Sequence, residues 1–423
     1  MTIHLPDGYA ILTTATVRDA VAKVPNLTAR LGGPASTWEI REIGDGNMNL
    51  VFDLVGPAGG LIVKQSLPYI RSVGESWPFP IGRIGFEHAA LIEQARVAPG
   101  RVPAVWHYDG AMALIVMERL SPHIILRKGL VRGIRYLRLA DQLGAFLARS
   151  LFLTSDLALS TPEKKALMAR FAGNAELCAT TEDVIFTGPY DAAAPLNRWT
   201  RPHLDSAVAA LRSDADAIAA AAELKLVFRT ATEALIHGDL HTGSIMVDAD
   251  DTRVIDPEWA FHGPMGFDLG AVIGNLLLAY FSQPGHATAT DDRVGYREWI
   301  LDLIVRLWTR FEADFIGLWR GRRSELLPPS VPPDSEVAER MYARRVSALL
   351  ADATGFAGAK MIRRLIGISH VEDFEAIADP ATRARCEAAA LACARDLMVR
   401  RAGFRDIGAV VDAARAIGAD QSR

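Results

Sequence analysis

The stretch LIHGDLHTGSIMVDADDTRVIDPEWAFHGPMGFDLG, residues 235–270, alternates short apolar runs with polar loops. The first apolar run leads into Asp239, the second covers residues 245–247, and the third is followed by Asp256 and Glu258. Short apolar runs bounded by Gly, Asp and Pro are typical of strands joined by turns. The pattern predicts a strand, a polar loop and a hairpin, which we expect to bring the three carboxylates onto one rim.

Three carboxylates on one rim suit metal-assisted phosphoryl transfer. Asp239 would accept or orient the proton of a substrate hydroxyl, while Asp256 and Glu258 would hold magnesium against nucleotide phosphates. Any one of these acids taken alone reads equally as a solvated turn residue, since Asp- and Gly-rich turns after strands are common. The order of the clusters, each behind an apolar strand, favours a kinase-type site.

Composition sets the broad class. The chain has 423 residues, 50% of them hydrophobic and 23% charged, which is enough for two lobes with a sizeable core. A net charge of −4 offers no electrostatic footprint for nucleic acid. Three cysteines without metal spacing, an N-terminus unlike a signal peptide and a longest apolar run too short to span a bilayer predict a cytoplasmic protein without a membrane partner.

The N-terminal part reads as a helix followed by a β-hairpin. Apolar residues at helical spacing predict a helix over 16–24, ended by Pro25, and strands are predicted over 38–43 and 50–55. The tip between the strands carries Gly44, Asp45, Gly46 and Asn47, whose backbone N–H groups could close over phosphates. An ordinary hairpin remains the alternative for this feature taken alone.

The next strand, over 60–65, ends its apolar run at Lys64, which suits a contact with nucleotide phosphates. A loop is predicted over 71–78 and a helix over 83–95. Glu87 on that helix is the candidate partner of Lys64, with a solvated helix face as the alternative.

Strands over 102–104 and 113–118 complete a small antiparallel sheet. The last of these runs ends in Glu118, Leu120 and Pro122, so we expect an edge strand that breaks at the proline. Its free backbone groups could pair with an adenine ring, and the segment would link the two lobes. The remaining chain is helical, which predicts lobes of residues 1–120 and 121–423. The expected helices cover 136–153, 162–177, 204–226, 270–281, 294–320, 335–353, 361–368, 380–402 and 406–416.

With these motifs laid out, the chain resembles the aminoglycoside-phosphotransferase-like branch of the protein-kinase fold, and within it the 5-methylthioribose kinases. The likeness rests on segments in order between about residues 44 and 373. These are GDGNMNLVF, VKQ, RSVGESWP, ALIVMERLSPHIILRKGL, HGDLHTGSI, DPEWAFHGPMGFD and GAKMIRRLIGISHVED. The resemblance implies an α+β, protein-kinase-like bilobal fold, with a small antiparallel β-rich N-lobe and a larger, mainly helical C-lobe.

The resemblance also implies an activity: transfer of the ATP γ-phosphate to the anomeric hydroxyl of methylthioribose, in methionine salvage. It implies Asp239 as the catalytic carboxylate, which also contacts the substrate, and Asp256 and Glu258 as Mg2+ ligands. Trp77, Arg363 and Arg364 are implied to contact the sugar. For ATP it implies the tip residues together with Lys64, Glu118 and Leu120. A homodimer is implied as well.

Some residues depart from the family pattern and leave alternatives open. Trp259 and His262 stand where Phe and Tyr are expected, and the loop after Trp77 is less like the family than its surroundings. A kinase of the same fold acting on another pentose, an amino alcohol or an aminoglycoside is the main alternative. A nucleotide-binding scaffold without activity is disfavoured by the intact carboxylates, and a protein kinase by the lack of an Ala-Pro-Glu anchor.

Overall fold

The chain divides into two compact units in the computed structural model. Unit 1 comprises Met1–Pro122 together with Arg253–Ala260, and unit 2 comprises His123–Thr252 together with Phe261–Arg423. The predicted lobes did not anticipate that residues 253–260 return to unit 1. The residues that the structure describes are 5–44, 48–71, 74–322 and 326–420.

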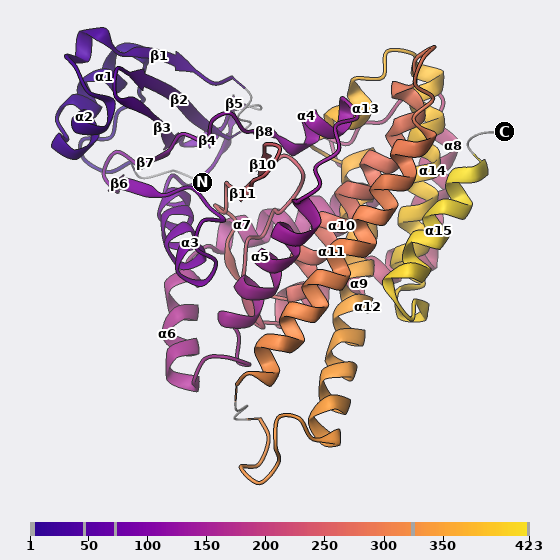
Figure 1. Ribbon diagram of the computed structural model, residues 1–423. Helices are drawn as coiled ribbons and strands as arrows, with labels where there is room; N and C mark the ends of the chain where they lie inside the picture. The colour runs from indigo at the N-terminus through magenta and orange to yellow at the C-terminus, as the bar shows by residue number, and fades with distance from the viewer. Residues whose placement is uncertain (1–4, 45–47, 72–73, 323–325, 421–423) are drawn as a thin grey trace. The chain divides into compact units, whose positions relative to one another are not determined.

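Unit 1 is built on a five-stranded antiparallel sheet with the strand order β1-β2-β3-β7-β6 (Figure 1). Its core forms because apolar side chains alternate along the central strands, so that one face of the sheet is buried. Leu50, Phe52 and Leu54 pack with Val17 of α1 and Leu27 of α2. The strands are β1 (Glu39–Glu42), β2 (Asn49–Gly56), β3 (Gly59–Ser66), β6 (Val105–Asp109) and β7 (Leu114–Glu118).

Three helices accompany this sheet: α1 (Thr14–Ala22), α2 (Pro25–Leu31) and α3 (Arg83–Val97). Helix α1 lies two residues earlier than the predicted 16–24 and ends at Ala22, before Pro25. Pro25 instead begins α2, where its fixed φ and missing N–H suit the first helical position. Helix α3 runs over the predicted residues and two beyond them, which places Glu87 within its second turn.

Two predictions about the strands of unit 1 are wrong. The predicted loop over 71–78 is largely a hairpin, with β4 (Tyr69–Ile70) pairing with β5 (Gly74–Pro78). Because this sequence is rich in Gly, Ser and Pro, which favour turns, strands this short cannot be recognised in it. The strand predicted over 102–104 instead forms as β6, which holds the strand-favouring aromatic residues Trp106 and Tyr108.

The prediction that the strand ending at Glu118 is an edge strand is also wrong. This strand, β7, lies between β3 and β6, and the N–H of Glu118 donates to the Ala104 carbonyl at 2.8 Å. A backbone N–H already used in this way cannot also pair with a ring. Any adenine contact at this residue therefore falls to its carbonyl, together with Leu120.

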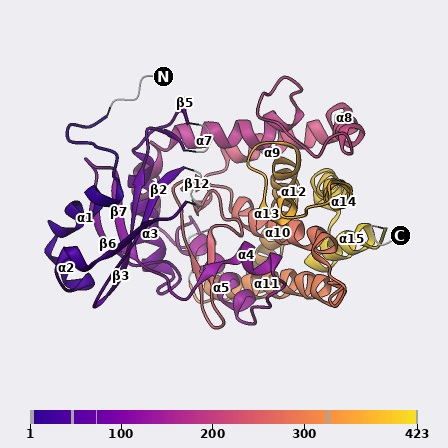
Figure 2. The ribbon, with the colours of Figure 1, turned by 90° about the horizontal axis from the view of Figure 1, so that it is seen from above.

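Unit 2 is mainly helical, and α10 (Met265–Ser282) lies at its centre. It packs against α11 (Val294–Arg320), α12 (Glu336–Ile366) and α14 (Pro380–Val399), and Figure 2 shows α12, α14 and α15 close together. The short strands are β8 (Ile124–Ile125), β9 (Ala234–Ile236), β10 (Ile245–Val247), β11 (Thr252–Val254, which runs into unit 1) and β12 (Phe261–Gly263). The other helices are α4 (Leu126–Val131), α5 (Leu139–Leu153), α6 (Thr161–Phe171), α7 (Ala175–Glu182), α8 (Asp205–Ser213), α9 (Ala215–Thr230), α13 (Glu372–Glu375) and α15 (Ile407–Asp420).

The predicted helices agree best with the structure where their apolar stripe is clear, and α11 has the predicted bounds. The helices predicted over 335–353 and 361–368 form one helix, α12, because its middle is buried on all sides and shows no stripe. The helix predicted over 204–226 is divided at Asp214, whose side chain caps α9 by accepting from the Ala217 N–H at 3.1 Å. The one predicted over 162–177 is likewise split into α6 and α7.

Helix α10 is apolar around its whole circumference. Residues 265–286 are long and apolar enough to cross a membrane by length and composition, and every residue of α10 within this segment is buried. Packing against neighbouring helices therefore accounts for its composition.

A row of glycines lets α10 approach α12 closely. Gly266, Gly270 and Gly274 recur every four residues and so lie along one face of α10. A Cβ on Gly270 would lie 2.5 Å from the Ala353 carbonyl oxygen, and one on Gly274 would lie 2.8 Å from that of Ala357. The separation of the two helices therefore depends on the absence of side chains in this row.

We expect Gly270→Ala to lower the free energy of unfolding by about 1–3 kcal/mol, because its methyl group would meet backbone atoms of α12 that cannot move alone. Urea unfolding measures the difference. Gly317→Ala on α11 is the control, since Gly317 is exposed and a Cβ there would meet nothing within 4 Å. It should stabilise the chain by roughly 0.5–1 kcal/mol. Equal stability of the two variants would contradict this account of the α10–α12 contact.

Candidate active site

The loop that carries Asp239 follows β9 in unit 2, and hydrogen bonds to Asp268 fix its backbone. The Asp268 carboxylate, in the first turn of α10, accepts from the N–H groups of His237 at 2.6 Å and Gly238 at 3.1 Å. Gly238 has φ 85°, a left-handed conformation that side chains disfavour, which explains a glycine beside Asp239. Sequence reasoning missed Asp268, whose only signal is an acidic residue at the start of an apolar helix.

Four basic side chains surround the Asp239 carboxylate. Lys360 Nζ lies 3.3 Å and Arg363 Nη1 3.7 Å from its Oδ1. Arg364 Nη2 lies 3.6 Å and His241 Nε2 3.4 Å from its Oδ2. Lys360, Arg363 and Arg364 all come from the last two turns of α12, and none of the five side chains is more than 18% exposed. The structure thus brings the predicted arginines to Asp239 and adds Lys360 and His241, which were not predicted.

His241 is neutral and donates to Asp239. Burial lowers the pKa of His241 to about 3, so the ring carries no charge at pH 7. Its Nδ1 accepts from the Gly243 N–H at 2.9 Å, which places the ring proton on Nε2, facing Asp239 Oδ2. The ring therefore orients the carboxylate without adding to the positive charge around it.

The charges of this group do not balance. Burial alone would raise the pKa of Asp239, but His241, Lys360 and Arg364 hold it well below its usual range. Burial lowers the pKa of Lys360 to about 8, with Asp239 opposing the shift, so Lys360 is mostly protonated at pH 7. Three cations then face one carboxylate. Such a group stabilises an incoming anion and repels a cation.

Lys360 is the most enclosed of these cations. Its ammonium donates to Asp239 and to the Gly238 carbonyl, and it also lies 4.0 Å from the centre of the Phe267 ring. The side chain is only 3% exposed. On the sequence alone Lys360 reads as part of a solvated helix face, and the structure contradicts that reading.

Unit 1 holds a second group, centred on Lys64 of β3. Lys64 Nζ donates to Glu87 Oε1 at 2.9 Å, which confirms the predicted pair, and it also contacts Asp256 Oδ1. Burial would lower the pKa of Lys64, but Asp256, Glu87 and Glu258 outweigh burial and raise it. Lys64 is thus a permanent cation among three carboxylates.

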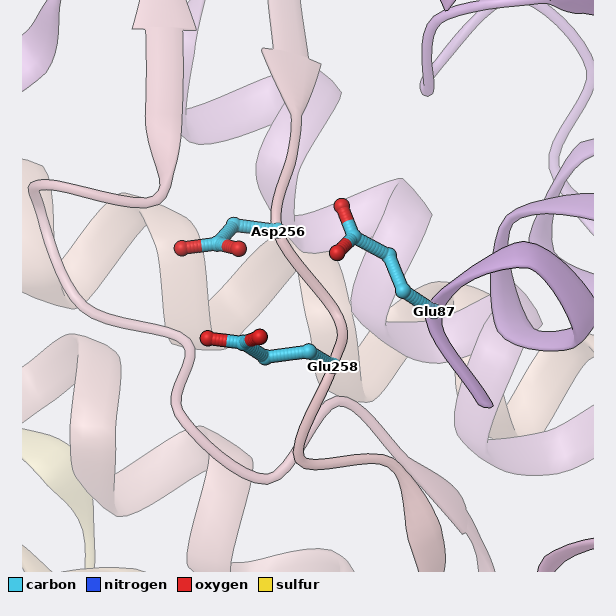
Figure 3. A group of neighbouring side chains, drawn as sticks. All are labelled: Glu87, Asp256 and Glu258. Atoms are coloured by element: carbon cyan, nitrogen blue, oxygen red, sulfur yellow. The ribbon is translucent and has the colours of Figure 1, made fainter. Parts of the chain in front are cut away.

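The side chains of the three acidic residues of unit 1 lie near one another (Figure 3). One oxygen from each of Glu87, Asp256 and Glu258 lies within 4.8 Å of the others. Burial raises the pKa of Glu87 to about 8, against the effect of Lys64. Clustered carboxylate oxygens are the donor set that Mg2+ prefers, so these residues fit a magnesium ion. The predicted ligands Asp256 and Glu258 belong to this group, and Glu87 is an addition.

Asp256 is the accessible member of the group and has an unusual backbone. Its side chain is 42% exposed, whereas that of Glu258 is 2% exposed. Its φ of 68° places a non-glycine residue in the left-handed region, a conformation that is concentrated at functional sites. Glu258 Oε2 accepts from Asn49 Nδ2 at 2.9 Å and from Arg83 Nε at 3.1 Å.

The structure says less about the remaining predicted residues. Gly44 is described, whereas Asp45, Gly46 and Asn47 lie outside the described residues. Trp77 is partly buried on β5. Because Asp239 belongs to unit 2 while Asp256 and Glu258 belong to unit 1, the expectation that the three meet on one rim stays a prediction.

The two departures from the family pattern have identifiable surroundings. The Trp259 ring packs 6.1 Å from that of Phe79, as an aromatic filler would. His262 lies on β12 with its ring 6.3 Å from that of Phe171, and burial lowers its pKa to about 4, with a contribution from Lys164. Both of these neighbours of His262 are residues of α6, and neither belongs to the basic side chains around Asp239.

Comparison with known proteins places this geometry in context. The sequence model described as "Phosphotransferase enzyme family" matches residues 39–302. Methylthioribose kinase 1 of Oryza sativa subsp. japonica is 46% identical over 409 residues, covering 96% of this chain and 95% of that protein. The methylthioribose kinase of Escherichia coli O45:K1 (strain S88 / ExPEC) is 43% identical over 422 residues, covering 98% and 100%. That of Bacillus pumilus (strain SAFR-032) is 39% identical over 393 residues, covering 92% of each.

We expect Asp239→Asn to lower the free energy of unfolding by roughly 3 kcal/mol, because it leaves three enclosed cations without their anion. Urea unfolding measures the loss. Asp314→Asn is the control: Asp314 pairs with Arg310 on α11 in the same unit, and their side chains are 30% and 43% exposed, so no enclosed cation loses its partner. That change should cost about 0–1 kcal/mol. An Asp239→Asn variant as stable as the control would mean that the cations are neutralised in another way.

Proposed function

The chain belongs to the phosphotransferase enzyme family and, within it, to the methylthioribose kinases, and from this premise we propose its reaction. The protein transfers the γ-phosphate of ATP to the anomeric (1-) hydroxyl of S-methyl-5-thioribose, giving S-methyl-5-thioribose 1-phosphate and ADP in methionine salvage. The observation that carries the proposal is identity of 39–46% to methylthioribose kinases over most of the chain. The cationic group around Asp239 supports it independently.

Asp239 orients the attacking hydroxyl in this proposal. Its low pKa makes it a weak base, but phosphoryl transfer passes through a loose transition state that asks little of the nucleophile. A carboxylate oxygen that is held in place and accepts a hydrogen bond from the substrate hydroxyl is therefore sufficient. The proton leaves this hydroxyl late in the reaction. Arg363 and Arg364 contact the sugar and the transferred phosphate, since planar guanidinium groups match the charge that spreads over the phosphoryl oxygens. Trp77 is proposed as a further sugar contact.

The residues of unit 1 hold the nucleotide. Lys64 contacts the phosphates, and the hairpin tip with Gly44, Asp45, Gly46 and Asn47 covers them. Asp256 and Glu258 would hold Mg2+, which when bound would neutralise charge on the nucleotide phosphates. Backbone groups of Glu118 and Leu120 pair with the adenine ring.

A positively charged acceptor fits this chain poorly. Choline and aminoglycosides carry cations, which Lys360, Arg363 and Arg364 would repel from Asp239. A neutral sugar avoids that repulsion, and its phosphorylated product is attracted. We also propose that the protein is cytoplasmic and a homodimer, from its composition and its family.

The proposal is tested by coupled ADP release with MgATP, comparing methylthioribose with ribose, 5-deoxyribose, choline and kanamycin. We expect turnover with methylthioribose and at most weak turnover with the other sugars. The two cationic acceptors should give none. Efficient turnover of choline or kanamycin would reject both the acceptor and the charge argument.

Replacing Asp239 tests its role separately. Asp239→Ala should lower kcat by about 10²–10⁴-fold, the usual range for a group that handles a proton in the transition state. Affinity for MgATP should change little, because Asp239 is assigned to the acceptor. Assays at a temperature where the variant is folded, beside Asp314→Ala as the control, separate this loss from instability. Near-normal turnover by Asp239→Ala would refute the assignment.

A further inference from the structure

The proposed reaction assigns no role to Arg83, an arginine of unit 1 whose side chain is fully buried. It is the first residue of α3, and its side chain is 0% exposed. Sequence reasoning treats it only as the beginning of a helix. A buried guanidinium is expensive unless its donors are satisfied, so the partners of Arg83 indicate what it is for.

Two of its contacts close a ring with Glu258. Arg83 Nε donates to Glu258 Oε2 at 3.1 Å, and Arg83 Nη2 donates to Asn49 Oδ1 at 2.7 Å. The Asn49 amide in turn donates to the same Glu258 Oε2 at 2.9 Å. Two donors from different segments that meet on one carboxylate oxygen restrict rotation of the carboxylate. Glu258 is thereby held in one orientation.

The other contacts reach three backbone carbonyls. Nη1 donates to Leu67 at 2.9 Å and Pro80 at 2.8 Å, which follow β3 and precede α3. Nη2 also donates to Met48 at 3.0 Å, next to the hairpin tip. One side chain thus connects Glu258 to the segments that flank the tip, Lys64 and α3. An arginine suits this task because its five N–H donors form a rigid planar fork, which a lysine does not have.

We propose that Arg83 is a positioning residue that fixes Glu258 for magnesium and couples it, through Asn49 and Met48, to the start of β2. This inference rests on the proposed use of MgATP but not on the identity of the acceptor. Helix α3 then carries two supporting residues one turn apart, since Arg83 holds Glu258 and Glu87 holds Lys64.

The experiment measures ADP affinity by calorimetry in EDTA and in Mg2+, without any acceptor. In Arg83→Met we expect the gain in affinity that Mg2+ provides to fall by about 10–100-fold, the usual effect of removing a partner of a metal ligand. Affinity in EDTA should change by less than about 3-fold. Asn49→Ala removes only one side of the ring and should lose a smaller part of the gain. The losses of the double variant should fall short of additivity, because both residues act on one oxygen.

Two further variants separate positioning from structure. Arg18→Met is the control, because Arg18 in the same unit donates to the carbonyls of Ala35 and Trp38, and it should leave the Mg2+ gain unchanged. If Arg83→Met does not fold, Arg83→Lys and Asn49→Ala carry the test. Equal losses in EDTA and in Mg2+ would show a merely structural role and overturn the inference. Wild-type protein whose ADP affinity is unaffected by Mg2+ would overturn both this inference and the proposed use of MgATP, whereas turnover of a different acceptor would leave this inference standing.

Discussion

The close approach of α10 and α12 is the constraint on which the chemistry of unit 2 depends. Helix α10 carries Asp268 in its first turn, where it fixes the loop of Asp239. Helix α12 carries Lys360, Arg363 and Arg364 in its last two turns, where they face that residue. The glycine row of α10 sets the separation of the two helices. A side chain in that row would therefore move the cations relative to the carboxylate, although it lies outside the charged group.

The group of charged side chains around Asp239 destabilises the fold. Burial and the neighbouring Arg363 lower the pKa of Arg364, which shows how unfavourable it is to hold these guanidinium groups together. Proteins tolerate such arrangements where function requires them and stabilise the fold elsewhere. In unit 2 the compensation comes from the apolar packing of α10, which is buried along its whole length.

Sequence reasoning succeeded where a residue's role is local. Strands β2, β3 and β9 and helix α11 follow clear periodicity, and the Lys64–Glu87 pair follows from a strand and helix in succession. It failed where the outcome depends on distant partners. The position of β7 inside the sheet is set by its pairing with β6 and β3, which periodicity does not encode. Strand β5 (Gly74–Pro78) is short and rich in Gly, Ser and Pro, so its sequence gives no clear strand signal.

The missed side chains share one cause. Arg83, Asp268 and Lys360 are single polar residues on helices, and helical spacing makes them look like solvated positions. Only the fold reveals that each meets a fixed partner, so their burial is tertiary information. The arginines of α12 were recognised through family resemblance and not through any pattern of their own.

The contact between Lys64 and Asp256 places a cation against one of the two proposed magnesium ligands. A divalent ion that arrives alone meets a carboxylate whose charge is already neutralised, and its gain in free energy is reduced accordingly. Nucleotide phosphates offer the ammonium another anion and so release the carboxylate. Under the proposed function, the lysine would therefore favour binding of metal together with nucleotide over binding of metal alone.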